Sequence, residues 1–249
     1  MNLEYSFDAA HVVRSALSLL RPYDVMDARK VRVGRPFDGG YAMIEAFDGV
    51  EAAYSLGIND DVSWDVEIAN RSIDVFQYDH TIENLPAQHP RFHWEKAGIA
   101  AFSSENMRSI ADLIKINGHE NAGNMILKCD IECAEWEALR HTPSNILSKF
   151  SQIVIELHDI HRLGNPEDLG VRQALANLTN AHHVVHVHAN NYGGVSMVGG
   201  ITLPNVIEVT LLRKDMGHFI PSKLMFPTSM DMPCDRSAAD IFLGSFEFS

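Results

Sequence analysis

The sequence has little positive charge and no long apolar run. It holds 20 Lys and Arg against 33 Asp and Glu, so its formal net charge is −13 at pH 7. This excess of negative charge repels phosphate backbones and anionic lipid surfaces, so we expect no nucleic-acid partner and no membrane partner. No segment reaches the roughly 18 consecutive apolar residues of a membrane span, and the N-terminus lacks the basic region of a signal peptide.

Cysteine is also scarce. The three cysteines are Cys129, Cys133 and Cys234, an odd number without the spacing of a disulfide framework. We therefore expect a reducing, cytoplasmic location.

Several familiar motifs are missing. No G-x-G-x-x-G or Walker pattern is present, and neither an H-E-x-x-H motif nor a Cys/His zinc spacing occurs. The sequence also has no repeat of fixed period. It therefore does not predict a dinucleotide fingerprint or a structural zinc site.

What is present is an alternation of apolar strands and helical segments, expected to form one domain. We predict an N-terminal helix and glycine-turn hairpin in residues 1–50, an α/β core in 51–214 and a C-terminal extension in 215–249, packed on the surface with a short helix at "SAADIF". Strands separated by helices favour a mostly parallel sheet covered on both faces.

Seven apolar segments are expected to be the strands of this sheet. They are "AAYSLGI", "SIDVFQYD", "RFHWEKAGIA", "NMILKCD", "QIVIELHD", "HVVHVHA" and "NVIEVTLLR". Helices are expected at residues 60–71, 104–118, 134–140 and 168–181, and the link before the last strand is weakly helical in pattern.

Polar residues follow these strands, where open parallel sheets bind ligands. Asp79 lies 22 residues after Gly57 and could accept a ribose or cap a helix. Asp130 and Glu132 are two residues apart, so an extended strand would point both to one face, although Glu132 could instead cap the following helix. Glu135 and Glu137 are expected on a solvated helix face.

With these positions collected, the sequence resembles the FkbM-like branch of class I S-adenosylmethionine-dependent methyltransferases. The similarity runs from about residue 30 to 214 and rests on "RVGRPFDGGYAM", "YSLGINDDVSWD", "LKCDIECAEWEAL" and "IVIELHDI". The third stretch is similar to the family pattern K-x-D-x-E-G-A-E, with Cys133 in place of glycine. If that glycine serves a turn with positive φ, cysteine strains it; if it must only be small, cysteine fits.

The resemblance implies a Rossmann-like sheet of seven strands with the last one antiparallel. It also implies that S-adenosylmethionine binds at the carboxyl ends of the first strands. The residues implied for the cofactor are Asp38, Gly39, Gly40, Gly57, Asn59, Asp79, Gly98, Ile99 and Asp130.

For catalysis we expect Asp130, Glu132 and His158, with methyl transfer to a hydroxyl of a small-molecule or saccharide-like acceptor. Mg²⁺ is a possible second cofactor, with Asp130, His158 and Asp159 as candidate ligands. Two other hypotheses stay open: a metal-dependent hydrolase or lyase that uses the Asp/His cluster, and a non-catalytic binding protein of similar fold. The sequence identifies neither the acceptor nor the oligomeric state.

Overall fold

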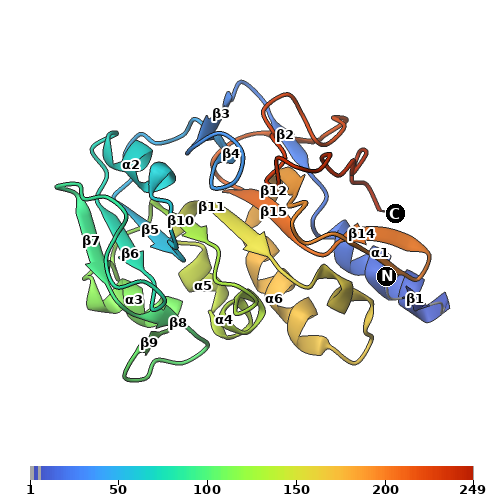
Figure 1. Ribbon diagram of the computed structural model, residues 1–249, viewed down its shortest axis with the longest axis horizontal. Coiled ribbons are helices and arrows are strands. Elements are labelled where there is room, and N and C mark those ends of the chain that lie inside the picture. Colours follow the sequence, from blue (N-terminus) through green and yellow to red (C-terminus); the bar gives the residue numbers. More distant parts are fainter. Residues whose placement is uncertain (1–2, 5–6, 249) are drawn as a thin grey trace.

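A central sheet of seven strands organises the protein. The computed structural model describes residues 3–4 and 7–248. In spatial order the strands are β12 (His182–Ala189), β15 (Ile207–Arg213), β11 (Phe150–Leu157), β10 (Met125–Cys129), β5 (Ala52–Leu56), β6 (Val75–Tyr78) and β7 (Phe92–Glu95) (Figure 1).

The directions of these strands define the fold. All neighbouring pairs are parallel except those of β15, which runs antiparallel to both β11 and β12. From β5 the chain proceeds outward to β6 and β7, and from β10 it proceeds the other way to β11. This is the strand order of the Rossmann-like methyltransferase fold, and it confirms the predicted sheet with one antiparallel strand.

Helices cover one face of the sheet and a shorter layer covers the other (Figure 1). The first layer contains α1 (Phe7–Ser18), α3 (Ile110–Ile116), α4 (Glu135–His141), α5 (Ser144–Leu147) and α6 (Leu169–Asn180). The second contains α2 (Ser63–Ala69) and the hairpin of β3 (Lys30–Val33) and β4 (Tyr41–Ile44).

Alternation along the strands explains why both layers are needed. Tyr54 and Leu127 belong to the apolar cluster under the first layer, whereas their neighbours Ala53 and Ile126 belong to the cluster under α2 and the hairpin. Because both faces of these strands are apolar, each must be covered, which is the pattern of buried parallel sheets.

The N-terminal hairpin is fixed to the sheet by buried hydrogen bonds. The side chain of Gln152 on β11 accepts from the Ile44 amide at 2.6 Å and donates to its carbonyl at 3.1 Å. Thr210 on β15 donates to the Ala42 carbonyl at 2.6 Å. The hairpin buries the polar side chains of Gln152 and Thr210, and its backbone supplies their hydrogen-bond partners.

Three segments depart from the expected secondary structure. The link between β12 and β15 is not helical but a hairpin of β13 (Val195–Val198) and β14 (Ile201–Pro204), and residues 237–242 form no helix. The helix expected at 104–118 is shorter, because β9 (Met107–Arg108) pairs with β8 (Gly98–Ile99) before Ser109 caps α3. Strand pairing replaces the helical pattern at residues 107–108 and 195–204, whereas residues 237–242 form a turn and irregular chain.

The short strands β1 (Leu3–Glu4), β2 (Tyr23–Val25), β16 (Phe219–Pro221) and the 3₁₀-helix η1 (Ile160–Gly164) complete the described elements. β16 pairs with β2, and the extension beyond it buries Phe226, Cys234 and Phe246. Within the described residues, none of the helices has both the length and the apolar character needed to cross a bilayer.

Candidate functional site

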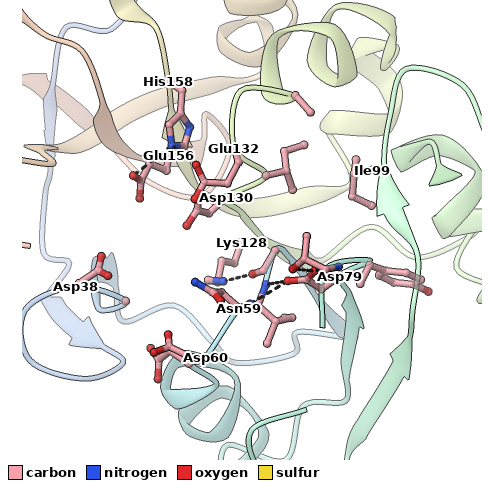
Figure 2. Close-up of a pocket in the computed structure, with 18 of the residues that line it drawn as sticks. Asp38, Asn59, Asp60, Asp79, Ile99, Lys128, Asp130, Glu132, Glu156 and His158 are labelled. Carbon is pink, nitrogen blue, oxygen red and sulfur yellow. Dashed lines mark hydrogen bonds and ion pairs between the residues drawn. The ribbon is translucent and has the colours of Figure 1, made fainter. Parts of the chain in front are cut away.

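A cavity of about 870 Å³ opens at the carboxyl edge of the sheet, beside the ends of β5, β6, β10 and β11 (Figure 2). It brings together most of the residues singled out in the sequence: Asp38, Gly39, Gly57, Asn59, Asp79, Gly98, Ile99, Asp130, Glu132 and His158. Gly40 and Asp159 are not among its lining residues.

Gly57 lies at the centre of this arrangement. Its φ of +81° favours glycine, and a Cβ on it would lie 1.6 Å from the carbonyl oxygen of Asp130. The Asp130 amide donates to the Leu56 carbonyl at 2.8 Å, so the ends of β5 and β10 are in direct backbone contact. No other residue fits at position 57 without moving one of these strands.

Asp79 acts on the loop after β5. Its Oδ2 accepts from the amides of Ile58 and Asn59 at 2.8 and 2.9 Å, and its Oδ1 accepts from the amide and hydroxyl of Thr81 at 2.7 and 2.6 Å. Burial works against ionisation here, but these hydrogen bonds outweigh it and lower the pKa of Asp79. The carboxylate shapes the loop and does not cap a helix.

Lys128 was not predicted as a site residue. It lies on β10 with only 6% of its surface exposed, and its Nζ donates to the Gly57 carbonyl at 2.6 Å. Lys128 lines the cavity with Asp130 because they are two residues apart, a spacing that could have indicated it from the sequence.

Asp130, Glu156 and His158 form the acidic side of the cavity (Figure 2). One potential ligand atom from each lies within 4.8 Å of the others. Asp130 Oδ1 is buried without a hydrogen-bond partner, and burial raises the pKa of this carboxyl to about 6 although Lys128 opposes the shift. Burial and the neighbouring Asp130 likewise raise the pKa of Glu156.

Glu132 does not share a strand face with Asp130. β10 ends at Cys129, and Glu132 and Cys133 both have positive φ, of +51° and +74°. The strand-based expectation is wrong because the chain has already turned. Glu132 caps no helix; its side chain is 83% exposed and approaches His158 Nε2 at 3.4 Å from the solvent side.

Glu135 corrects a second expectation. It does not lie on a solvated helix face but is fully buried, with its Oε1 3.0 Å from His158 Nδ1 and 3.1 Å from the Ile131 amide. Burial alone would lower the pKa of His158. The hydrogen bond to Glu135 and the negative charge of Glu135 outweigh burial, so the pKa of His158 is raised. The E-W-E spacing alone could not tell which glutamate faces inward.

Asp159 has left-handed backbone geometry, with φ of +54°, and its Oδ1 lies 4.0 Å from His161 Nδ1. The structure thus groups Glu156, not Asp159, with Asp130 and His158. Glu156 and His158 alternate along β11 and its end, and this spacing could have indicated the pair.

The hairpin turn supplies the remaining wall. Asp38 and Gly39 line the cavity, and Arg35 lies within 3.8 Å of Asp38 and Asp60 and 3.4 Å of Asp61. Burial, then the charge of Glu208, raises the pKa of Asp38. Both Arg35 and Lys128 are therefore already engaged by groups of the protein.

Comparison with known proteins gives partial similarities. No family model matches the chain. "Probable methyltransferase-like protein 24" of Homo sapiens is 28% identical over 118 residues, covering 42% of this chain and 32% of that protein. The protein of the same name in Rattus norvegicus is 27% identical over 118 residues, with the same coverage. The chain thus spans about a third of the length of these curated relatives.

Among solved structures, "Crystal Structure of the N-terminal domain of EvdMO1 with SAH bound" aligns with a TM-score of 0.37 and 12% identity. The alignment covers 68% of this chain and 76% of that one.

Proposed function

We propose that the protein is an S-adenosylmethionine-dependent methyltransferase of the FkbM-like branch, which methylates a hydroxyl of a small-molecule or saccharide-like acceptor. The observation that supports this best is the position of the cavity. It opens where the strand order reverses between β5 and β10, which is where open α/β sheets bind their ligands. The curated relatives named as methyltransferases agree with it.

We assign the cofactor and the acceptor to opposite sides of the cavity. On the β5–β6 side, Gly57, Asn59 and Asp79 form a tight, hydrogen-bonded loop suited to the cofactor. Gly98 and Ile99 line the same side, and a Cβ on Gly98 would lie 2.6 Å from His80 Nδ1. The β10–β11 side, with Asp130, Glu156 and His158, is left for the acceptor.

The acceptor side contains a group that can take the proton from the acceptor hydroxyl. When bound, the cofactor supplies a methyl group on a positively charged sulfur, and transfer requires the acceptor oxygen to lose its proton as it attacks. Glu135 holds His158 at Nδ1, which leaves Nε2 directed to the side where Glu132 and Glu156 lie. We assign His158 as the general base, with Glu135 as the residue that positions it.

Calorimetric titration with S-adenosylmethionine and S-adenosylhomocysteine tests the proposal. Wild-type protein should bind both, and Asp79→Ala should weaken binding at least tenfold because the Ile58–Asn59 loop loses its acceptor. Asp74→Ala is the matched control, since Asp74 precedes the same strand at the opposite edge of the sheet. No binding by wild-type protein would overturn the proposal.

A second experiment separates catalysis from binding. Asp130→Ala should abolish product formation while cofactor affinity stays within about threefold of wild type. If wild-type protein binds the cofactor but methylates none of a panel of hydroxyl acceptors, the non-catalytic alternative is favoured.

A metal-dependent hydrolase or lyase is the second candidate, and the Asp130–Glu156–His158 cluster is the observation that favours it. Two carboxylates and an imidazole suit a divalent cation, and the unpartnered Asp130 Oδ1 offers it a free ligand atom. The same three residues would hold Mg²⁺ in a metal-dependent methyltransferase, where the ion would polarise the acceptor hydroxyl. Hydrolytic activity lost with chelator, without cofactor binding, would favour this candidate.

A further inference from the structure

A second cluster of side chains that could bind a metal lies outside the lining of the cavity and outside the residues assigned to methyl transfer. It consists of His188 on β12, Glu208 on β15 and Cys234 in the C-terminal extension. One potential ligand atom from each lies within 4.8 Å of the others. All three residues are buried, with exposed fractions of 2%, 6% and 2%.

The fold brings these residues together from three parts of the chain. His188 and Glu208 are direct cross-strand partners in the β12–β15 register. Cys234 reaches them from the extension, which Figure 1 shows lying beside these two strands. Glu208 follows His188 by 20 residues and precedes Cys234 by 26 residues, so no short sequence motif could reveal the three ligands.

We propose that His188, Glu208 and Cys234 bind a zinc ion that fastens the C-terminal extension to the sheet. An imidazole nitrogen, a carboxylate oxygen and a thiolate sulfur are the three donor types that Zn²⁺ accepts in proteins. The sulfur argues against Mg²⁺ and Ca²⁺, which prefer oxygen ligands.

Two contacts, each to a different carboxylate oxygen of Glu208, are near the spacing of zinc ligands. Zn–N and Zn–O bonds of about 2.0–2.2 Å and Zn–S bonds of about 2.3 Å place neighbouring ligand atoms about 3.3–3.6 Å apart. Cys234 Sγ lies 3.4 Å from Glu208 Oε1, and His188 Nδ1 lies 2.8 Å from Glu208 Oε2. The ion would replace the proton between His188 and Glu208 and open that pair by about half an ångström.

The outer partners also fit. His188 Nε2 lies 3.2 Å from both carboxylate oxygens of Asp240. A zinc-bound histidine commonly donates its second N–H to such a carboxylate, which fixes the tautomer with the other nitrogen facing the metal. Asp240, like Cys234, comes from the extension.

Charge gives an independent reason for a cation here. His188 lies between the carboxylates of Glu208 and Asp240, and Cys234 Sγ lies 3.4 Å from Glu208, so two acidic groups and a thiol surround one imidazole. His188 is the basic group that hydrogen-bonds Glu208. A dication would neutralise the thiolate and relieve the repulsion between the buried carboxylates.

The site has no role in the methyl transfer proposed above, so it can be tested apart from activity. Full-length protein, purified under reducing conditions, should contain one zinc per chain by elemental analysis. Replacement of zinc by Co²⁺ should give the intense near-ultraviolet band of a cobalt–thiolate bond. The Asp130–Glu156–His158 cluster cannot produce this band, because it contains no sulfur.

Variants identify the ligand. Cys234→Ser should lose the thiolate band and bind zinc at least 100-fold more weakly, and Asp240→Asn should weaken binding about 10- to 100-fold. Cys133→Ser is the matched control. It should keep both the cobalt–thiolate band and the zinc affinity, because Cys133 is exposed and is not part of the His188–Glu208–Cys234 cluster.

X-ray absorption at the zinc edge of wild-type protein gives a measurement that needs no variant. One sulfur among nitrogen and oxygen neighbours is expected. Zinc-free wild-type protein that also gives no thiolate band with Co²⁺, a band that persists in Cys234→Ser, or a zinc environment without sulfur would each overturn the proposal.

Discussion

At the scale of single residues, Cys133 has the most direct consequence. The sequence left open whether position 133 lies in a positive-φ turn or only requires a small side chain, and the φ of +74° places Cys133 in such a turn. A left-handed conformation costs a non-glycine residue about 1–2 kcal/mol, part of which glycine's greater freedom when unfolded offsets.

We therefore expect Cys133→Gly to raise the free energy of unfolding by up to about 1 kcal/mol. Cys133→Ala keeps the strained backbone and should leave stability nearly unchanged. Denaturant unfolding of the three proteins checks this, and equal midpoints for the glycine and alanine variants would show that the turn is not strained.

The pH dependence of catalysis is a second prediction at this scale. His158 must be neutral to accept a proton, and its pKa is raised above the ordinary 6.5 by Glu135 against the effect of burial. The kcat/KM should therefore rise with pH through a value above 6.5.

Glu135→Gln removes that negative charge and lowers the pKa of His158, so the rising limb should move to lower pH while maximal activity falls. Glu137→Gln, on the exposed side of the same helix, should leave the profile unmoved. A Glu135→Gln profile that overlays the wild-type one would remove Glu135 from its positioning role.

At the scale of elements, the C-terminal extension behaves as part of the core. Phe226 is fully buried and packs edge-on against His186 at 5.3 Å, and His186 Nε2 lies 2.7 Å from Asp231 Oδ1. Phe226→Ala should cost about 3–5 kcal/mol through lost burial and the cavity left behind.

The control is Phe242→Ala in the same extension, where the ring is 70% exposed and should contribute little. Thermal unfolding and limited proteolysis compare the two. Equal stability of both variants would mean that the extension is not docked on the sheet.

The elements also show what the sequence could predict. The central strands were predictable because apolar residues occupy most of both faces, as in residues 125–127 of β10. The β13–β14 hairpin was missed although its signal is local, since Gly199 and Gly200 form its turn with positive φ. The non-helical 237–242 segment was not predictable, because it is held by distant groups such as the Asn191 side chain, which donates to the Ala239 carbonyl.

The same distinction holds for the site. Gly57, Asp79 and Asp130 were accessible from strand ends, and Glu156 and Lys128 from alternation. The inward position of Glu135 was not, because a helix that begins just after a turn can present either glutamate to the core.

At the scale of the whole molecule, charge should select the acceptor. Seven carboxylates line the cavity, from Asp38, Asp60, Asp61, Asp79, Asp130, Glu132 and Glu156. The lining cations Arg35 and Lys128 are engaged by the protein itself, and the net charge is −13. The field near the opening is therefore negative.

We expect a neutral saccharide to be methylated with a higher kcat/KM than its phosphorylated form, and added salt should narrow the difference by screening the repulsion. Steady-state assays at two ionic strengths test this. A phosphorylated acceptor that is preferred at low salt would contradict it.

The close approach of Gly57 to the carbonyl of Asp130 also limits which substitutions evolution can accept at residue 57. The loop proposed for the cofactor and the strand end proposed for the acceptor approach so closely that a Cβ on residue 57 would lie 1.6 Å from the Asp130 carbonyl oxygen. A lineage could not enlarge residue 57 without first displacing the main chain at residue 130. Among relatives that keep this turn, position 57 should therefore remain glycine whatever side chain stands at position 130, because the clash is with the main chain.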